Sequence, residues 1–177
     1  SSQMVVEVPE ECDLTIDCRF GTTEVSGISG NVTVQGDHSF IHVSSCAGVL
    51  TITNSMGEIR VREFRGPVTV DNSHAEITLD DIRGNVSARN AFAQTSIAGS
   101  RGDLTFNCKG MIFIVDHRGN AVLENSNGST SIRDIRGDVR LVSSFGKAEI
   151  ENVEGTFTLM SQNGASLLTN IEGACTV

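Results

Sequence analysis

The chain has 177 residues, 38% of them hydrophobic, and a formal net charge of −9 at pH 7. This apolar content is sufficient for one packed core and excludes a disordered chain, while the acidic balance argues against a general affinity for nucleic acid or for an anionic membrane surface. Glycine and β-branched residues are common and there are 2 prolines, a mix that favours short strands joined by tight turns.

Residues 1–11 are expected to form a lead-in that caps the domain at its start. Met4 to Val8 are an irregular apolar run, and residues 1–11 lack the basic and apolar regions of a secretory signal peptide. A first coil begins at Cys12, so the repeat domain covers residues 12–177. Because the pattern stops inside a new coil, we expect the chain to be a fragment of a longer protein or to pair end to end with a partner.

A glycine returns at a nearly fixed interval from residue 30 onwards. Successive members lie 18 residues apart, except that Gly102 and Gly119 are 17 apart. Self-similarity at one short period is typical of a solenoid, in which each repeat is one coil stacked on its neighbours. We therefore predict an all-β, single-stranded parallel β-helix (β-solenoid) of roughly nine to ten coils. The glycines expected to form its corners are Gly30, Gly48, Gly66, Gly84, Gly102, Gly119, Gly137, Gly155 and Gly173.

Each coil is expected to carry two short strands. With the glycine as position 1, apolar residues recur at positions 3, 5, 12, 14 and 17. Residues two apart face the same side of a strand, so each pair marks a strand with an inward apolar side, and position 17 marks a third inward corner. Coils stacked at about 4.8 Å place these residues in five columns and make the sheets parallel. The coil that starts at Gly66 shows the pattern in Val68, Val70, Ile77, Leu79 and Ile82.

Polar residues form columns as well. Asparagine recurs at position 7 and glycine at position 10, and both residue types tolerate left-handed backbone angles, so these positions are expected to be corners. Stacked asparagine amides are expected to hydrogen-bond along their column. Position 4 is mostly threonine, which strand propensity explains better than an ice-binding array. The asparagine column consists of Asn54, Asn72, Asn90 and Asn125.

Position 18 carries arginine in five consecutive coils. Carboxylates lie two residues before four of these arginines and two residues after Arg101 and Arg136. Two interpretations stay open: a surface ladder in which the carboxylates compensate the arginines, which we favour, and an anion-binding stripe. The ladder consists of Arg65, Arg83, Arg101, Arg118 and Arg136.

Catalytic and metal-binding patterns are not evident. The turns are too short for a groove built from long loops, and the 17-residue interval, near Lys109 and Gly110, is expected to shorten a corner without forming a lid. Carboxylates beside arginines stay ionised and are poorly suited to act as general acids. His38 and His74 share a column but lie two coils apart, and no Cys or His spacing is typical of zinc sites. We predict no enzymatic activity, no cofactor and no metal site.

The cysteines number 5, so at least one thiol has no partner within the chain. Cys46 and Cys175 fall in apolar columns and are expected to be buried small hydrophobic residues. Cys108 falls in the asparagine column, and Cys12 and Cys18 bracket a strand that holds them too far apart for a disulfide.

The segment LENSNGSTSIRDIRGDVRLVSSFGKAEIENVEG (123–155) and the later LMSQNG (159–164) resemble a bacterial adhesin-like β-strand repeat family, a domain of unknown function. Its lead-in strand and first coil are similar to VEVPEECDLTIDCRFGTTEVSG (6–27). The resemblance covers nearly the whole chain. It implies a right-handed solenoid in an extracytoplasmic protein, periplasmic or at the cell surface, with no established enzymatic activity.

Three functions are consistent with these observations. The first is a non-catalytic scaffold for adhesion or envelope association, whose partner is a protein or glycan of the cell surface and which reaches a membrane only through a segment outside this chain. The second is a self-assembling filament of the bactofilin type, formed by end-to-end stacking. The third is a β-helix enzyme acting on polysaccharides. We expect the first.

Overall fold

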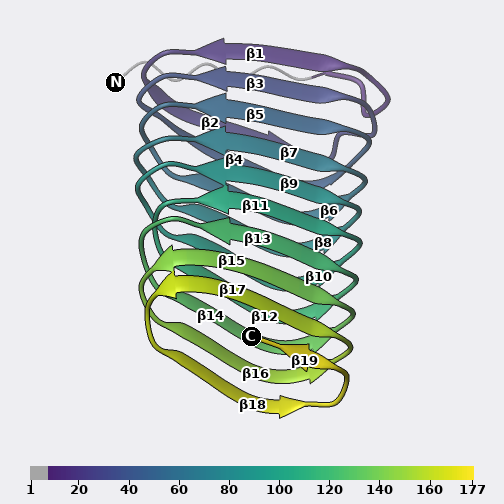
Figure 1. Cartoon of the computed structure of the whole chain (residues 1–177). Helices are drawn as coiled ribbons and strands as arrows, with labels where there is room; N and C mark the ends of the chain where they lie inside the picture. The colour runs from purple at the N-terminus through teal and green to yellow at the C-terminus, as the bar shows by residue number, and fades with distance from the viewer. Residues whose placement is uncertain (1–7) are drawn as a thin grey trace.

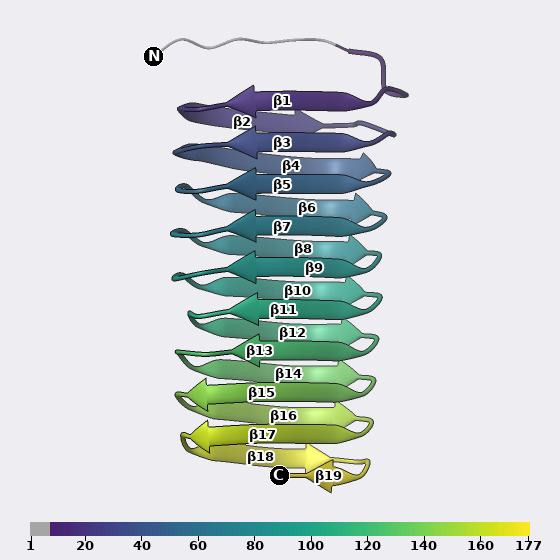
Figure 2. The same ribbon diagram turned by 45° about the horizontal axis from the view of Figure 1, so that its top comes forward.

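The computed structural model describes residues 8–177 and confirms the predicted parallel β-solenoid of about nine turns, with no helix in that range. The chain winds back and forth between two facing sheets, a ten-stranded sheet A of the odd-numbered strands and a nine-stranded sheet B of the even-numbered strands (Figures 1 and 2). β1 lies at one end of the stack, and β18 and β19 lie at the other (Figure 2). Every turn is therefore one strand of each sheet and two corners.

The strands follow the expected repeat. Sheet A consists of β1 (Leu14–Cys18), β3 (Val32–Gly36), β5 (Leu50–Asn54), β7 (Val68–Asn72), β9 (Val86–Asn90), β11 (Leu104–Cys108), β13 (Ala121–Asn125), β15 (Val139–Phe145), β17 (Phe157–Asn163) and β19 (Cys175–Thr176). Sheet B consists of β2 (Gly21–Ser26), β4 (Ser39–Ala47), β6 (Ile59–Arg65), β8 (Ile77–Arg83), β10 (Thr95–Arg101), β12 (Ile112–Arg118), β14 (Thr130–Arg136), β16 (Ala148–Glu154) and β18 (Ser166–Ile171).

The register stacks equivalent residues directly. Val68 pairs with Val86, 18 residues on, whereas Leu104 pairs with Ala121, 17 residues on. Three residues, 109–111, join β11 to β12, while four, 126–129, join β13 to β14. The missing residue is thus absorbed in one shortened corner, as predicted, and both sheets continue through it.

The core is a set of stacked apolar columns between the sheets. Ile77, Leu79 and Ile82 of β8 are buried, and the same three positions are buried in most turns. Full burial of such a side chain is worth about 1.5–3 kcal/mol, so the core is built from many similar contributions between neighbouring coils.

Position 17 is not a separate corner, contrary to the expectation. It belongs to the second strand, and the second of the two residues that separate it from position 14 has a left-handed backbone. Glu63 (φ 52°), Asp81 (φ 48°), Asp116 (φ 51°) and Asp134 (φ 57°) occupy this site. A residue in this conformation breaks the alternation of the strand, so the next side chain points inward again.

The repeating glycines are required by close contact between backbones. A Cβ atom on Gly84 would lie 2.2 Å from the carbonyl oxygen of Gly66, its neighbour in the preceding coil. Gly48 and Gly66 have positive φ values of 121° and 128° as well, but the φ of Gly84 lies outside the left-handed region. Glycine at position 84 is therefore required by the approach of the stacked coils, which excludes a side chain there, and not by a left-handed backbone.

The asparagine column stabilises the corner opposite the repeating glycines, but not through the expected hydrogen bonds between stacked amides. Its members lie at the ends of strands without left-handed angles, and their amides do not bond to one another. Asn72 Nδ2 donates to the carbonyl oxygens of Gly57 (3.1 Å) and Ala75 (3.0 Å), in the preceding and the same corner. Each buried amide thus joins two stacked corners, and each of these carbonyls accepts from the asparagines of two neighbouring coils.

The two ends of the stack differ from its middle. Residues 1–7 of the predicted lead-in lie outside the described residues, and residues 8–13 contain no strand. Ser29 donates its backbone N–H to the carbonyl oxygen of Glu10 (2.7 Å). In the last coil Cys175 is exposed, which corrects the expectation that it is buried, whereas Cys46 is buried.

Candidate functional site

The arginine column lies along one edge of sheet B, at the ends of five neighbouring strands. β6, β8, β10, β12 and β14 each end in an arginine, and each of these arginines pairs in register with the next. Neighbouring strands lie about 4.8 Å apart, so the five side chains are spread over about 19 Å parallel to the solenoid axis. All five are exposed. The column contains five of the 13 basic residues of this acidic chain.

Ion pairs compensate only part of this charge. Arg83 Nη2 lies 3.3 Å from Asp81 Oδ2, and Arg136 Nε lies 3.1 Å from Glu154 Oε2 in the next coil. Within residues 8–177, the other three arginines have no carboxylate oxygen within 4.0 Å. These three are Arg65, Arg101 and Arg118.

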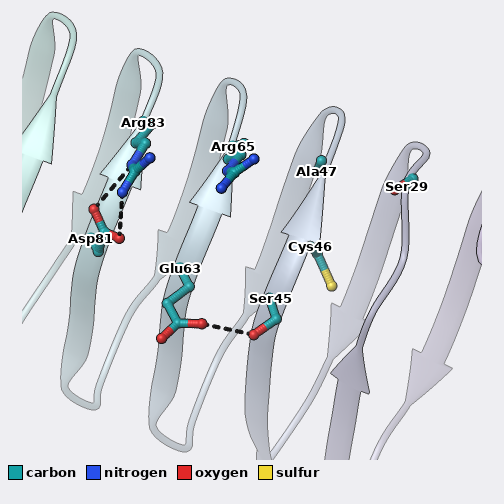
Figure 3. Close-up of a pocket in the computed structure, with 8 residues that line it drawn as sticks. All are labelled: Ser29, Ser45, Cys46, Ala47, Glu63, Arg65, Asp81 and Arg83. Carbon is teal, nitrogen blue, oxygen red and sulfur yellow. Dashed lines mark hydrogen bonds and ion pairs between the residues drawn. The ribbon is translucent and has the colours of Figure 1, made fainter.

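Local features explain why two of these three arginines have no ion-pair partner in the described part of the chain. Two residues before Arg101 stands Gly99, which has no side chain to pair with it. Two residues before Arg65 stands Glu63, whose Oε2 instead accepts a hydrogen bond from Ser45 Oγ (2.8 Å), as Figure 3 shows. The predicted compensation by nearby carboxylates is therefore incomplete along the column.

The carboxylates on the far side of the glycine corner serve the backbone. Asp138 Oδ1 accepts the backbone N–H of Thr156 (2.8 Å), and Asp103 Oδ1 accepts that of Asn120 (3.3 Å). Asn85 and Asp13 make the same contact with the coil that follows each of them. These side chains satisfy a main-chain donor at each step of the corner, which accounts for their presence without a ligand.

A shallow groove of about 440 Å³ opens at the β6 end of the column. Preceding coils place the small residues Ser29 and Ala47 in register with Arg65, and these leave the space open. In Figure 3 the guanidinium groups of Arg65 and Arg83 lie on adjacent strands, with Glu63 and Asp81 beside them. The groove thus presents cationic donors and anionic acceptors together.

A buried Ser–His pair lies inside the solenoid, in the column of position 17. Ser100 Oγ and His117 Nδ1 are 2.9 Å apart, and His117 Nε2 has no hydrogen-bond partner within the described residues. Burial lowers the pKa of His117 below its ordinary value, which favours the neutral imidazole. Because both side chains are buried, no substrate reaches them. This pair was not predicted from the sequence, although a serine and a histidine in an otherwise apolar column indicate it.

The cysteines show no sign of shared chemistry. All five are free, and Cys108 is buried with Thr95 Oγ1 3.7 Å from its sulfur. Burial raises the pKa of the Cys108 thiol, whereas a hydrogen bond with Ser39 and a second with Thr23 lower that of Cys18. An inert thiol is the expected state of Cys108.

The predicted histidine column is exposed at the corner opposite the arginines. His38 stacks on Phe20 with 5.4 Å between ring centroids, and His74 stacks on Phe92 with 5.1 Å. No three His, Cys, Asp or Glu side chains in residues 8–177 are grouped as metal ligands. Each of these two histidine rings packs against the phenylalanine ring of a neighbouring coil, parallel to the solenoid axis.

Comparison with known proteins gives no match to a protein-family description, to a curated protein or to a solved structure. Of what the family resemblance implied, the β-solenoid architecture is confirmed by the fold itself. In the part of the chain that the structure covers, none of the elements is a helix of the length and hydrophobicity required to cross a bilayer.

Proposed function

We propose that the protein is a non-catalytic scaffold that presents long, rigid β-surfaces to a binding partner outside the cytoplasm. The observation that carries this proposal is the unbroken register of both sheets, which leaves only short corners and shallow grooves. Enzymes on repeat scaffolds need a cleft that excludes water and converging acid–base groups. The buried Ser100–His117 pair is closed off inside the core.

The extracytoplasmic location and the adhesive role rest on the adhesin-like corners and lead-in described above. The location is tested on the full-length gene product carrying a C-terminal tag. Protease treatment of intact cells, compared with osmotically opened cells and with a cytoplasmic marker, is expected to reach the tag before the inner membrane is broken. A tag that is cut only after complete lysis would refute the location.

The non-catalytic character has its own test. The purified chain is incubated with a panel of neutral and acidic polysaccharides, and new reducing ends and unsaturated products are measured. No release above buffer is expected. Turnover that is lost on replacing one groove acid, for example Glu63→Gln, would favour the polysaccharide-active enzyme instead.

A filament formed by end-to-end stacking of copies is the second candidate, and the parallel order of both sheets favours it. Parallel pairing by β18 and β19 with the first strands of a second copy would continue both sheets in the same direction. Leu167 in β18 is 56% exposed, and Leu168 and Ile171 are half-buried. Sedimentation at increasing concentration and negative-stain images test this candidate, and a monomer at all concentrations would exclude it.

A further inference from the structure

We infer that the arginine column binds a linear polyuronate, a polysaccharide with repeated carboxylates, laid parallel to the solenoid axis. This inference rests on the proposed scaffold function and names its ligand class. The column consists of Arg65, Arg83, Arg101, Arg118 and Arg136.

The unpaired positive charge of the arginine column favours an anionic ligand. Guanidinium groups on adjacent strands at about 4.8 Å repel one another, and an exposed column of this kind is relieved by anions that lie between them. Arg65, Arg101 and Arg118 have no carboxylate partner among residues 8–177. Arginine presents a planar fork of donors that matches a carboxylate with two hydrogen bonds.

The straight, evenly spaced arginine column favours a ligand with evenly spaced charges. The column is straight because its members pair in register from β6 to β14, and it ends at Ala47 on one side and at Glu154 on the other. A linear uronate chain carries one carboxylate on every sugar ring, so carboxylates recur at regular intervals along each side of the chain. A periodic row of arginines therefore matches a periodic row of carboxylates better than it matches a single small anion.

The carboxylates that flank the arginines favour a polyuronate over a nucleic acid as the ligand. Glu63, Asp81, Asp116 and Asp134 flank the arginines in the same sheet, two residues before them. Carboxylates accept hydrogen bonds from sugar hydroxyl groups, which a uronate carries on every ring and which DNA lacks along its backbone. The stacked rings that could hold bases, Phe20 with His38 and His74 with Phe92, lie at the corner opposite the arginines.

The experiment measures binding of the full chain to polygalacturonate oligomers by calorimetry. The expected result is binding that weakens with salt and that strengthens with oligomer length until about five sugar rings cover the column. A fully methyl-esterified oligomer, which has the same backbone without the charges, is expected not to bind. Oligo(dT) and polyphosphate are tested in parallel.

The variant is Arg65→Gln, Arg101→Gln and Arg118→Gln together. Its matched control removes the same charge from the outer face of the same sheet, at Arg60, Arg62 and Arg133. The column variant is expected to lose about tenfold or more in affinity, and the control less than about threefold. Circular dichroism before titration establishes that both variants are folded.

Four results would overturn the inference: no binding by the unaltered chain, equal binding of the methyl ester, equal loss in both variants, or tighter binding of oligo(dT) or polyphosphate than of polygalacturonate. Turnover of the oligomer, measured in the same samples, would instead refute the non-catalytic scaffold. The two failures are therefore distinguishable.

Discussion

Replacing Gly84 by alanine tests whether close backbone stacking or backbone conformation imposes the glycine repeat. The new Cβ would lie 2.2 Å from the Gly66 carbonyl oxygen and 2.4 Å from its carbon, where real Cβ contacts stay above 3.0 Å. The coils must therefore separate by nearly 1 Å at this corner, which stretches the bond from Gly66 N–H to the Arg83 carbonyl, now 2.8 Å.

The cost is the sum of two effects. Overpacking a tight contact costs about 1–3 kcal/mol, and a weakened main-chain hydrogen bond adds about 1 kcal/mol. We expect Gly84→Ala to lower the free energy of unfolding by about 2–4 kcal/mol. Gly27→Ala is the matched control, because Gly27 has a φ of 70° and nothing within 4 Å of its Cβ position. That change meets only backbone strain, about 1–2 kcal/mol.

The assay is urea unfolding followed by circular dichroism, with Thr69→Ser as an exposed strand substitution expected to change stability by less than about 0.5 kcal/mol. If Gly84→Ala proves no more destabilising than Gly27→Ala, then the close contact between stacked backbones is not what requires glycine at this corner.

Three further predictions concern buried polar groups. Burial lowers the pKa of His117 in the folded chain below its ordinary 6.5, so the free energy of unfolding is highest above that pH and falls as the pH drops below it. Unfolding midpoints measured from pH 8 to pH 5 should therefore decrease as the pH falls. His117→Ile should flatten this profile, and an unchanged slope in the variant would contradict the prediction. Asn72→Ala removes two hydrogen bonds, one to each of two stacked corners, and should cost about 2 kcal/mol in urea unfolding, against less than about 0.5 kcal/mol for exposed Asn107→Ala; equal costs would contradict the corner assignment. A maleimide should label Cys18 long before Cys108 when sites are followed by peptide mass spectrometry; faster labelling of Cys108 would mean that its coil opens readily.

The arginine column could be predicted from the sequence, but its state of charge pairing could not. Five arginines at one spacing are visible in the printed chain. Which of them find a carboxylate depends on side-chain geometry across coils: Arg136 reaches Glu154 in the next strand, while Glu63 is held by Ser45 and leaves Arg65 free. Residue spacing alone does not contain those distances.

By itself, the sequence determined the architecture, because an 18-residue period and apolar pairs two residues apart permit only one stacking of coils that buries every column. It also located the shortened corner at residues 109–111. Only the tertiary structure decided why each corner needs its residue. The approach of the Gly84 backbone to Gly66, the donation by Asn72 to two stacked carbonyls, and the left-handed bend before position 17 are contacts between coils. Such contacts join residues far apart in the sequence, so no local propensity records them.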